Sequence, residues 1–89
     1  MLMYRYEILT EDKNRDFIEK TVNKYFSGYT LRKQIGYWQG TPEKSLSIII
    51  LAENKIEQEV ISIVCNEIKV YNNQDSVIYT VDKTIVFNI

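Results

Sequence analysis

The sequence predicts one α+β domain over residues 1–89, with the ferredoxin-like order β-α-β-β-α-β and both helices on one face of an antiparallel sheet. Two segments repeat apolar residues at intervals of three and four, which is the spacing of an amphipathic helix. Around and between these segments lie strand-sized runs rich in Ile, Val and Tyr. Right-handed crossovers join elements in this order into this arrangement.

The first strand and the first helix are predicted at residues 3–9 and 15–26. The strand segment is rich in Tyr and Ile, and a polar connector follows it. The helix segment has one apolar face, formed by residues four and three positions apart: Ile18, Val22 and Tyr25. Gly28 follows the last turn, and we expect it to adopt the left-handed conformation that closes many helices.

A hairpin is predicted next, with strands at residues 29–39 and 45–52 joined by a turn over Gly40–Glu43. Glycine and proline in the connecting segment are typical of such a turn. The first of the two strands alternates in part. One face carries Leu31, Lys33, Ile35, Tyr37 and Gln39, and the opposite face carries Thr30, Arg32, Gln34 and Trp38.

The strand at residues 45–52 is apolar on both faces, which is typical of a strand buried on both sides. In the ferredoxin-like layout it is a central strand, and one of its faces meets the helices. The other face, formed either by Ile49 and Leu51 or by Leu46 and Ile48, has nothing from its own chain to cover it. Because exposed apolar area usually marks an interface, we expect a homodimer through the open sheet face. Its predicted interface residues are Leu46, Ile48, Ile49 and Leu51.

The second helix is predicted from Asn54 to Tyr71. Asn54 and Glu57 have the spacing of a capping box, in which each side chain bonds to the other residue's backbone N–H. Its apolar stripe consists of Ile56, Val60, Ile63, Val64, Ile68 and Tyr71. Asn72 and Asn73 end this helix, and a strand follows at residues 76–81. After a bend at Asp82 and Lys83, residues 84–89 form either a further strand or the extension of the same one.

The charge balance disfavours general nucleic-acid binding, because 11 basic residues against 12 acidic ones leave a net charge of -1. No segment approaches the roughly 20 apolar residues that span a bilayer, and the N-terminal segment lacks the long apolar core of a signal peptide. We therefore expect a cytoplasmic protein that does not bind membranes.

Cys65 is the one cysteine, and the chain has no histidine, so an intrachain disulfide and a Cys/His zinc site are both excluded. Histidine is the side chain best suited to acid–base chemistry near neutral pH. Cys65 also lies in the middle of a predicted helix, with no histidine to activate it. These observations weigh against an enzyme without excluding one, and no metal or cofactor is expected.

Four short motifs follow one another along the chain: Gly28-Tyr29-Thr30, Gly36-Tyr37-Trp38, Glu43-Lys44-Ser45 and Gln74-Asp75-Ser76-Val77. In this order the chain resembles a family of small, functionally uncharacterised bacterial and phage-type proteins. That family shows F-x-G-x-T at the end of a helix, then G-x-W or G-x-Y, E-x-S before an apolar strand, and Q-x-S-V near the C-terminus. The resemblance covers residues 26–77. It implies the ferredoxin-like fold and a bacterial or mobile-element origin, and it implies no activity.

Two groups of polar side chains are candidate ligand-binding residues. Thr30, Arg32, Gln34 and Trp38 share one strand face and offer stacking and charge-assisted hydrogen bonds to a planar or anionic ligand. The alternative is a twisted strand whose Trp packs across a dimer contact. Glu43 and Ser45, with Gln74 and Ser76, form either a polar pocket rim or ordinary hydrogen bonds at strand starts. In the expected layout these last two pairs need not meet within one subunit.

The functional hypothesis is a small binding or accessory module of bacterial or phage origin that dimerises through its sheet. In its most concrete form it sequesters a host protein or a small nucleotide, as an anti-defence protein does. The alternatives are a cofactor-free enzyme of the dimeric α+β-barrel type and a purely structural interaction subunit. A perturbed carboxylate or tyrosine in an enclosed cavity would favour the enzyme.

Overall fold

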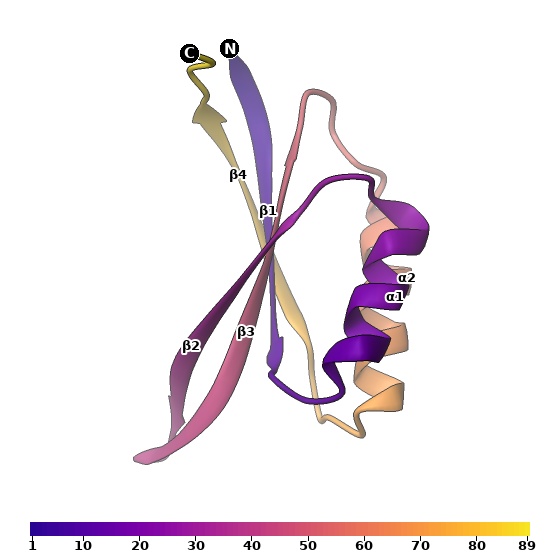
Figure 1. The fold of residues 1–89 in the computed structure, drawn as a ribbon, viewed down its shortest axis with the longest axis vertical. Helices are drawn as coiled ribbons and strands as arrows, with labels where there is room; N and C mark the ends of the chain where they lie inside the picture. The colour runs from indigo at the N-terminus through magenta and orange to yellow at the C-terminus, as the bar shows by residue number, and fades with distance from the viewer.

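The computed structural model describes all residues from 1 to 89 and has two layers, a twisted sheet and a pair of helices (Figure 1). The elements in chain order are β1 (Leu2–Glu11), α1 (Arg15–Tyr25), β2 (Thr30–Trp38), β3 (Thr41–Ala52), α2 (Gln58–Tyr71) and β4 (Ile78–Ile85). The four strands form one antiparallel sheet in the order β2-β3-β1-β4. Both helices cover the same face of it, so the predicted ferredoxin-like fold is confirmed.

The core lies between the helices and the two central strands, β1 and β3. In their register Tyr6 pairs with Ile50 and Ile8 pairs with Ile48, and all four side chains are buried. The remaining core positions come mainly from the inward faces of the helices: Ile18, Val22, Ile61, Val64, Cys65 and Ile68. Alternation along β1 therefore directs its other side chains, those of Arg5 and Glu7 among them, to the face that no helix covers.

Leu46 and Ile48 are fully buried in this core, with exposed fractions of 0%. The prediction that they take part in a dimer interface is wrong, because the same residues that face the helices cannot also face a partner across the open sheet. Ile49 and Leu51 lie on the open face, where their neighbours on β1 are Glu7 and Arg5. That face is mixed in character rather than continuously apolar.

The β2–β3 turn is tighter than the sequence indicated. Trp38 pairs with Thr41, so only Gln39 and Gly40 connect the strands, and both have positive φ angles, 48° and 79°. Two consecutive residues of this kind are the mark of the type I′ turn that matches strand twist in a two-residue hairpin. Thr41, Pro42 and Glu43 therefore belong to β3 and not to the turn.

Three further expectations about element ends are corrected. The second helix begins at Gln58, and its N-cap residue Glu57 makes no side-chain capping bond, so the capping box of Asn54 and Glu57 is absent. Gly28 has no left-handed φ, because α1 already ends at Tyr25 with an extended Phe26. The expected bend at Asp82 and Lys83 is absent, and of the two alternatives for residues 84–89 the extension of the last strand is the one observed, as far as Ile85. Neither helix has the length and apolar character needed to cross a membrane.

Candidate functional site

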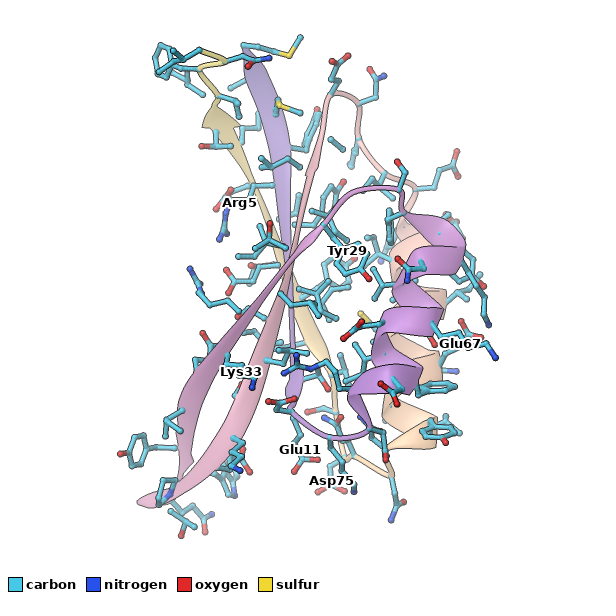
Figure 2. The ribbon with its side chains drawn as sticks, viewed as in Figure 1. Arg5, Glu11, Tyr29, Lys33, Glu67 and Asp75 are labelled. Carbon is cyan, nitrogen blue, oxygen red and sulfur yellow. The ribbon has the colours of Figure 1, made fainter.

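The uncovered face of the sheet carries a hydrogen-bonded polar cluster centred on Glu7. Its carboxylate accepts hydrogen bonds from Ser47 Oγ at 2.7 Å, from Arg5 at 3.0 Å and from Arg32 at 3.4 Å. Gln34 Nε2 in turn donates to Ser47 Oγ at 2.8 Å. Figure 2 shows Arg5 pointing away from the helices on this side. The cluster links β1, β2 and β3.

The charge of Glu7 is well compensated. The Ser47 hydrogen bond is the main cause that lowers the pKa of Glu7, with the hydrogen bond and charge of Arg5 and the charge of Arg32 adding to it against partial burial. A carboxylate that holds three donors in this way is already satisfied. The cluster therefore acts first as a structural brace between neighbouring strands.

A groove of about 550 Å³ lies at the end of the sheet where the β2–β3 hairpin extends past the end of β1, beside the segment that leads into β4. Figure 2 shows Glu11 and Asp75 at this end of the molecule. The residues that line the groove are Leu9, Thr10, Glu11, Trp38, Glu43, Ser45, Asn73, Gln74, Asp75, Ser76 and Ile78. The two predicted groups at the strand starts thus line one groove within a single subunit, because both meet the end of β1: Glu11 pairs with Ser45 on β3, and Thr10 is hydrogen-bonded to Gln74 of the segment before β4.

The segment from Asn73 to Ser76 is held in place by side-chain amides. Asn72, which is fully buried, donates from Nδ2 to the Gln74 Oε1 atom at 3.3 Å. Thr10 Oγ donates to the same Gln74 atom at 2.7 Å. Asn73 has a φ of 53°, a left-handed conformation that Asn tolerates better than most residues. The expectation that Asn72 and Asn73 end the second helix is confirmed.

The groove is acidic and partly aromatic. Glu11, Glu43 and Asp75 line it, no Lys or Arg does, and none of these carboxylates belongs to any of the four ion pairs of the structure. They do not come together as a set of metal ligands. Trp38 contributes a ring that is 69% exposed. The lining therefore offers negative charge, hydrogen-bond partners and one stacking surface.

The predicted ligand-binding residues divide between these two places. Trp38, Glu43 and Ser45 line the groove, whereas Arg32 and Gln34 belong to the Glu7 cluster. Thr30 lies on the same face but eight positions from Trp38, about 26 Å along an extended strand. One small ligand cannot contact the whole predicted set.

The prediction missed the contributions of β1 and β4 to the groove. Leu9 and Ile78 are paired across these strands, and Glu11 ends β1. An alternation argument for β1 would have placed Leu9 and Glu11 on the open face together with Glu7. The position of Asp75 depends on the path of a loop, for which the sequence carries no comparable periodicity.

Cys65 is buried in the core, and this burial raises the pKa of its thiol to about 11. A thiol with so high a pKa has almost no thiolate at neutral pH, and the thiolate is the reactive form. Cys65 is accordingly a packing residue.

Several solved structures share the fold of this chain. A phage SAM (S-adenosylmethionine) lyase in complex with S-methyl-5′-thioadenosine matches with a TM-score of 0.69 and 16% sequence identity, over 90% of this chain and 80% of that one. CPII, a nitrogen regulatory PII-like protein from Thiomonas intermedia K12 bound to ADP, AMP and bicarbonate, matches with a TM-score of 0.64 and 15% identity, over 100% and 97% of the two chains. The GlnK–ATP complex of B. subtilis matches with a TM-score of 0.66 and 14% identity, over 93% and 82%.

At these identities the comparisons show the fold alone. No family model matches the chain, and no curated protein does. The family resemblance carried by the four sequence motifs therefore stays a prediction, while the ferredoxin-like fold that it implied is confirmed.

Proposed function

We propose that the protein is a small binding module that takes an adenine nucleoside without phosphate groups, in the groove between the hairpin and the segment before β4. The observation that carries the proposal is the lining of this groove: an exposed Trp38 ring beside three carboxylates, with no Lys or Arg. An exposed aromatic ring stacks on a nucleobase and contributes about 1–3 kcal/mol per base in proteins that use this contact.

The charge of the groove selects among nucleosides. A phosphate group brought near Glu11, Glu43 and Asp75 meets like charge, with no cation in the lining to offset it. A sulfonium or ammonium group meets opposite charge and can also lie over the Trp38 ring as a cation–π partner. The groove therefore suits S-adenosylmethionine, or the uncharged S-methyl-5′-thioadenosine, better than ADP or ATP.

The ligands of the structural neighbours support the same ligand class. The phage lyase is named for its action on S-adenosylmethionine and holds S-methyl-5′-thioadenosine, and the PII-like neighbours hold ADP, AMP or ATP. All of these ligands contain adenosine, and the lack of basic residues in the groove favours the first pair for this chain. Sequestration of such a nucleoside is the form of accessory, anti-defence role that the groove supports.

Calorimetric titration with S-adenosylmethionine, S-methyl-5′-thioadenosine, ADP and ATP tests the proposal. Trp38→Ala should weaken binding of the thioadenosine about tenfold or more, because it removes the stacking surface. Tyr37→Ala is the matched control, since Tyr37 is equally exposed (71%) on the same strand but points to the opposite face. Absence of heat with all four compounds would refute nucleoside binding and would favour a host protein as the partner.

A second candidate function is a lyase that acts on S-adenosylmethionine. Glu43 favours it, because this carboxylate has no ion pair and lines the groove in which the sulfonium substrate would bind. In the reaction, the bond from sulfur to the aminobutyrate chain breaks and the electron pair stays on sulfur, while the carboxylate oxygen of the same substrate bonds to the released carbon and closes a lactone, so no co-reactant is needed. Chromatographic detection of S-methyl-5′-thioadenosine formed from S-adenosylmethionine, lost in Glu43→Gln, would establish catalysis. Unchanged substrate after prolonged incubation would leave binding alone.

Self-association through the open sheet face is the second part of the proposal. Ile49 is half-buried and Leu51 is 47% exposed on that face, beside the Glu7 cluster. Sedimentation at micromolar concentration should report a dimer that Leu51→Lys dissociates, while Ile63→Lys, at a similarly exposed site on α2, leaves it intact. A wild-type monomer at these concentrations would refute it.

A further inference from the structure

Gln74 stands out in the groove because its side-chain amide is held in one orientation. An amide can turn its oxygen or its nitrogen toward a neighbour, and the neighbours decide which arrangement satisfies all the hydrogen bonds. The contact that fixes the whole arrangement lies outside the groove, at the backbone carbonyl oxygen of Lys13. A carbonyl only accepts, so the Asn72 atom 3.0 Å from it must be the donor Nδ2.

The orientation of Asn72 follows from two contacts that agree. With Nδ2 on the Lys13 carbonyl, Asn72 Oδ1 faces Asn14 Nδ2 at 2.9 Å and accepts a hydrogen bond from it. Asn72 is fully buried, so no water competes for these atoms. The second Nδ2 proton of Asn72 then has one partner left, the Gln74 atom at 3.3 Å.

That Gln74 atom must be the oxygen. It accepts both from Asn72 Nδ2 and from Thr10 Oγ, the latter at 2.7 Å. Gln74 Nε2 is thereby turned to the other side, where it donates one of its two protons to the backbone oxygen of Ser76 at 3.3 Å. One N–H of Gln74 remains, on a residue that lines the groove and is only half-buried.

We propose that Gln74 is a specificity-determining donor of the groove and that Asn72 is the positioning residue that fixes its amide. This rests on the proposed function of the groove. The charged groups of the lining are all carboxylates, which only accept hydrogen bonds, so a fixed N–H gives the site a directional contact to an acceptor of the ligand, such as a ring nitrogen of adenine or a ribose oxygen. Asn72 does not line the groove and acts only through Gln74.

The isosteric variant Asn72→Asp tests whether Asn72 fixes the orientation of the Gln74 amide. It replaces Nδ2 by an oxygen that faces two acceptors, the Lys13 carbonyl and Gln74 Oε1. Rotation of the Gln74 amide relieves one of these clashes, and it turns the Gln74 oxygen toward the groove. Gln74→Glu removes the same donor directly. Asn66→Asp is the matched control, because it makes the same chemical change at an exposed position of α2.

The probe is S-methyl-5′-thioadenosine, titrated calorimetrically at a temperature where each variant is shown to be folded by circular dichroism. Asn72→Asp and Gln74→Glu should each weaken binding about tenfold, the effect of one lost hydrogen bond to a ligand, and Asn66→Asp should bind as wild type does. Wild-type affinity in both groove variants would overturn the inference while leaving the proposed function intact.

A readout without ligand separates the two claims. In nuclear magnetic resonance spectra of the wild-type protein, the Gln74 side-chain N–H protons should show contacts to Ser76 and not to Asn72. Wild-type protein that fails to bind the probe would refute the proposed function, and these contacts would still decide the orientation. Gln74 protons that contact Asn72, or that average between both sides, would overturn the inference.

Discussion

Replacement of Glu7 by glutamine tests whether the cluster on the open sheet face stabilises the fold. Glutamine keeps the shape of the side chain and one acceptor oxygen, but it loses the charge that Ser47, Arg5 and Arg32 bind. The side chain of Glu7 is only 17% exposed, so water replaces these partners poorly. The short Ser47 bond to a charged group contributes about 1.5–3 kcal/mol, and each partly exposed ion pair about 0.2–1 kcal/mol.

Because glutamine retains part of the Ser47 interaction, the expected loss is about 2 kcal/mol of the free energy of unfolding at neutral pH. A domain of this size has a total of roughly 4–13 kcal/mol, so the loss is a large fraction. It corresponds to a fall in Tm of about 8–16 °C. Thermal and urea unfolding followed by circular dichroism measure both quantities.

The pH dependence gives the sharper test. The pKa of Glu7 in the folded protein is lowered from its ordinary value of 4.5. The stability that the carboxylate contributes is therefore fully present above pH 4.5 and is lost as the pH falls through the lower folded-state pKa. The difference between wild type and Glu7→Gln should shrink toward acid, and Glu53→Gln, at an exposed position without an ion pair, should show no such difference. A gap that stays constant down to strongly acidic pH would refute the electrostatic reasoning.

Three further predictions concern single sites. Tyr6→Phe should lower the free energy of unfolding in urea by about 1–2 kcal/mol, because the buried hydroxyl accepts a hydrogen bond from the backbone N–H of Ile56 at 2.9 Å. Tyr37→Phe is the control and should not change it measurably, because Tyr37 is exposed. Gly40→Ala should lower stability by about 1 kcal/mol, since its φ of 79° strains any side chain, whereas Gly28→Ala, with open space around it, should not destabilise. Cys65 should react with a thiol reagent about 100-fold more slowly in the folded than in the urea-unfolded protein, because a pKa near 11 against 9.0 leaves a hundredth of the thiolate; equal rates would show an accessible thiol.

The element order was predictable because periodicity reports which residues share a face. Ile18 and Val22 recur at helical spacing and are fully buried, and the second helix shows the same for Val64 and Ile68. Element ends were less predictable. The β2–β3 turn depends on two residues with positive φ, Gln39 and Gly40. Of these two, only the glycine indicates that conformation in the sequence.

The choice between the two faces of β3 had to be left open because both are apolar in sequence. The deciding information lies on the neighbouring strand. Ile48 pairs with Ile8, whereas Ile49 pairs with Glu7, so only the first of these faces can be dry. Strand pairing is a long-range property, and a local pattern in β3 does not contain it.

The contrast between Glu7 and the carboxylates of the groove indicates where a ligand would bind. Glu7 is already ion-paired with Arg5 and Arg32, so an incoming cation would have to displace contacts that stabilise the sheet. The groove carboxylates Glu43 and Asp75 have no such partners, and their charges remain available to a ligand. Because no cation lines the groove, a bound cation gains the attraction of these carboxylates without displacing an existing ion pair. The same charge pattern explains why the basic residues of this sheet face, though suited to anions, do not by themselves make a nucleotide site: Arg5 and Arg32 are both already ion-paired with Glu7.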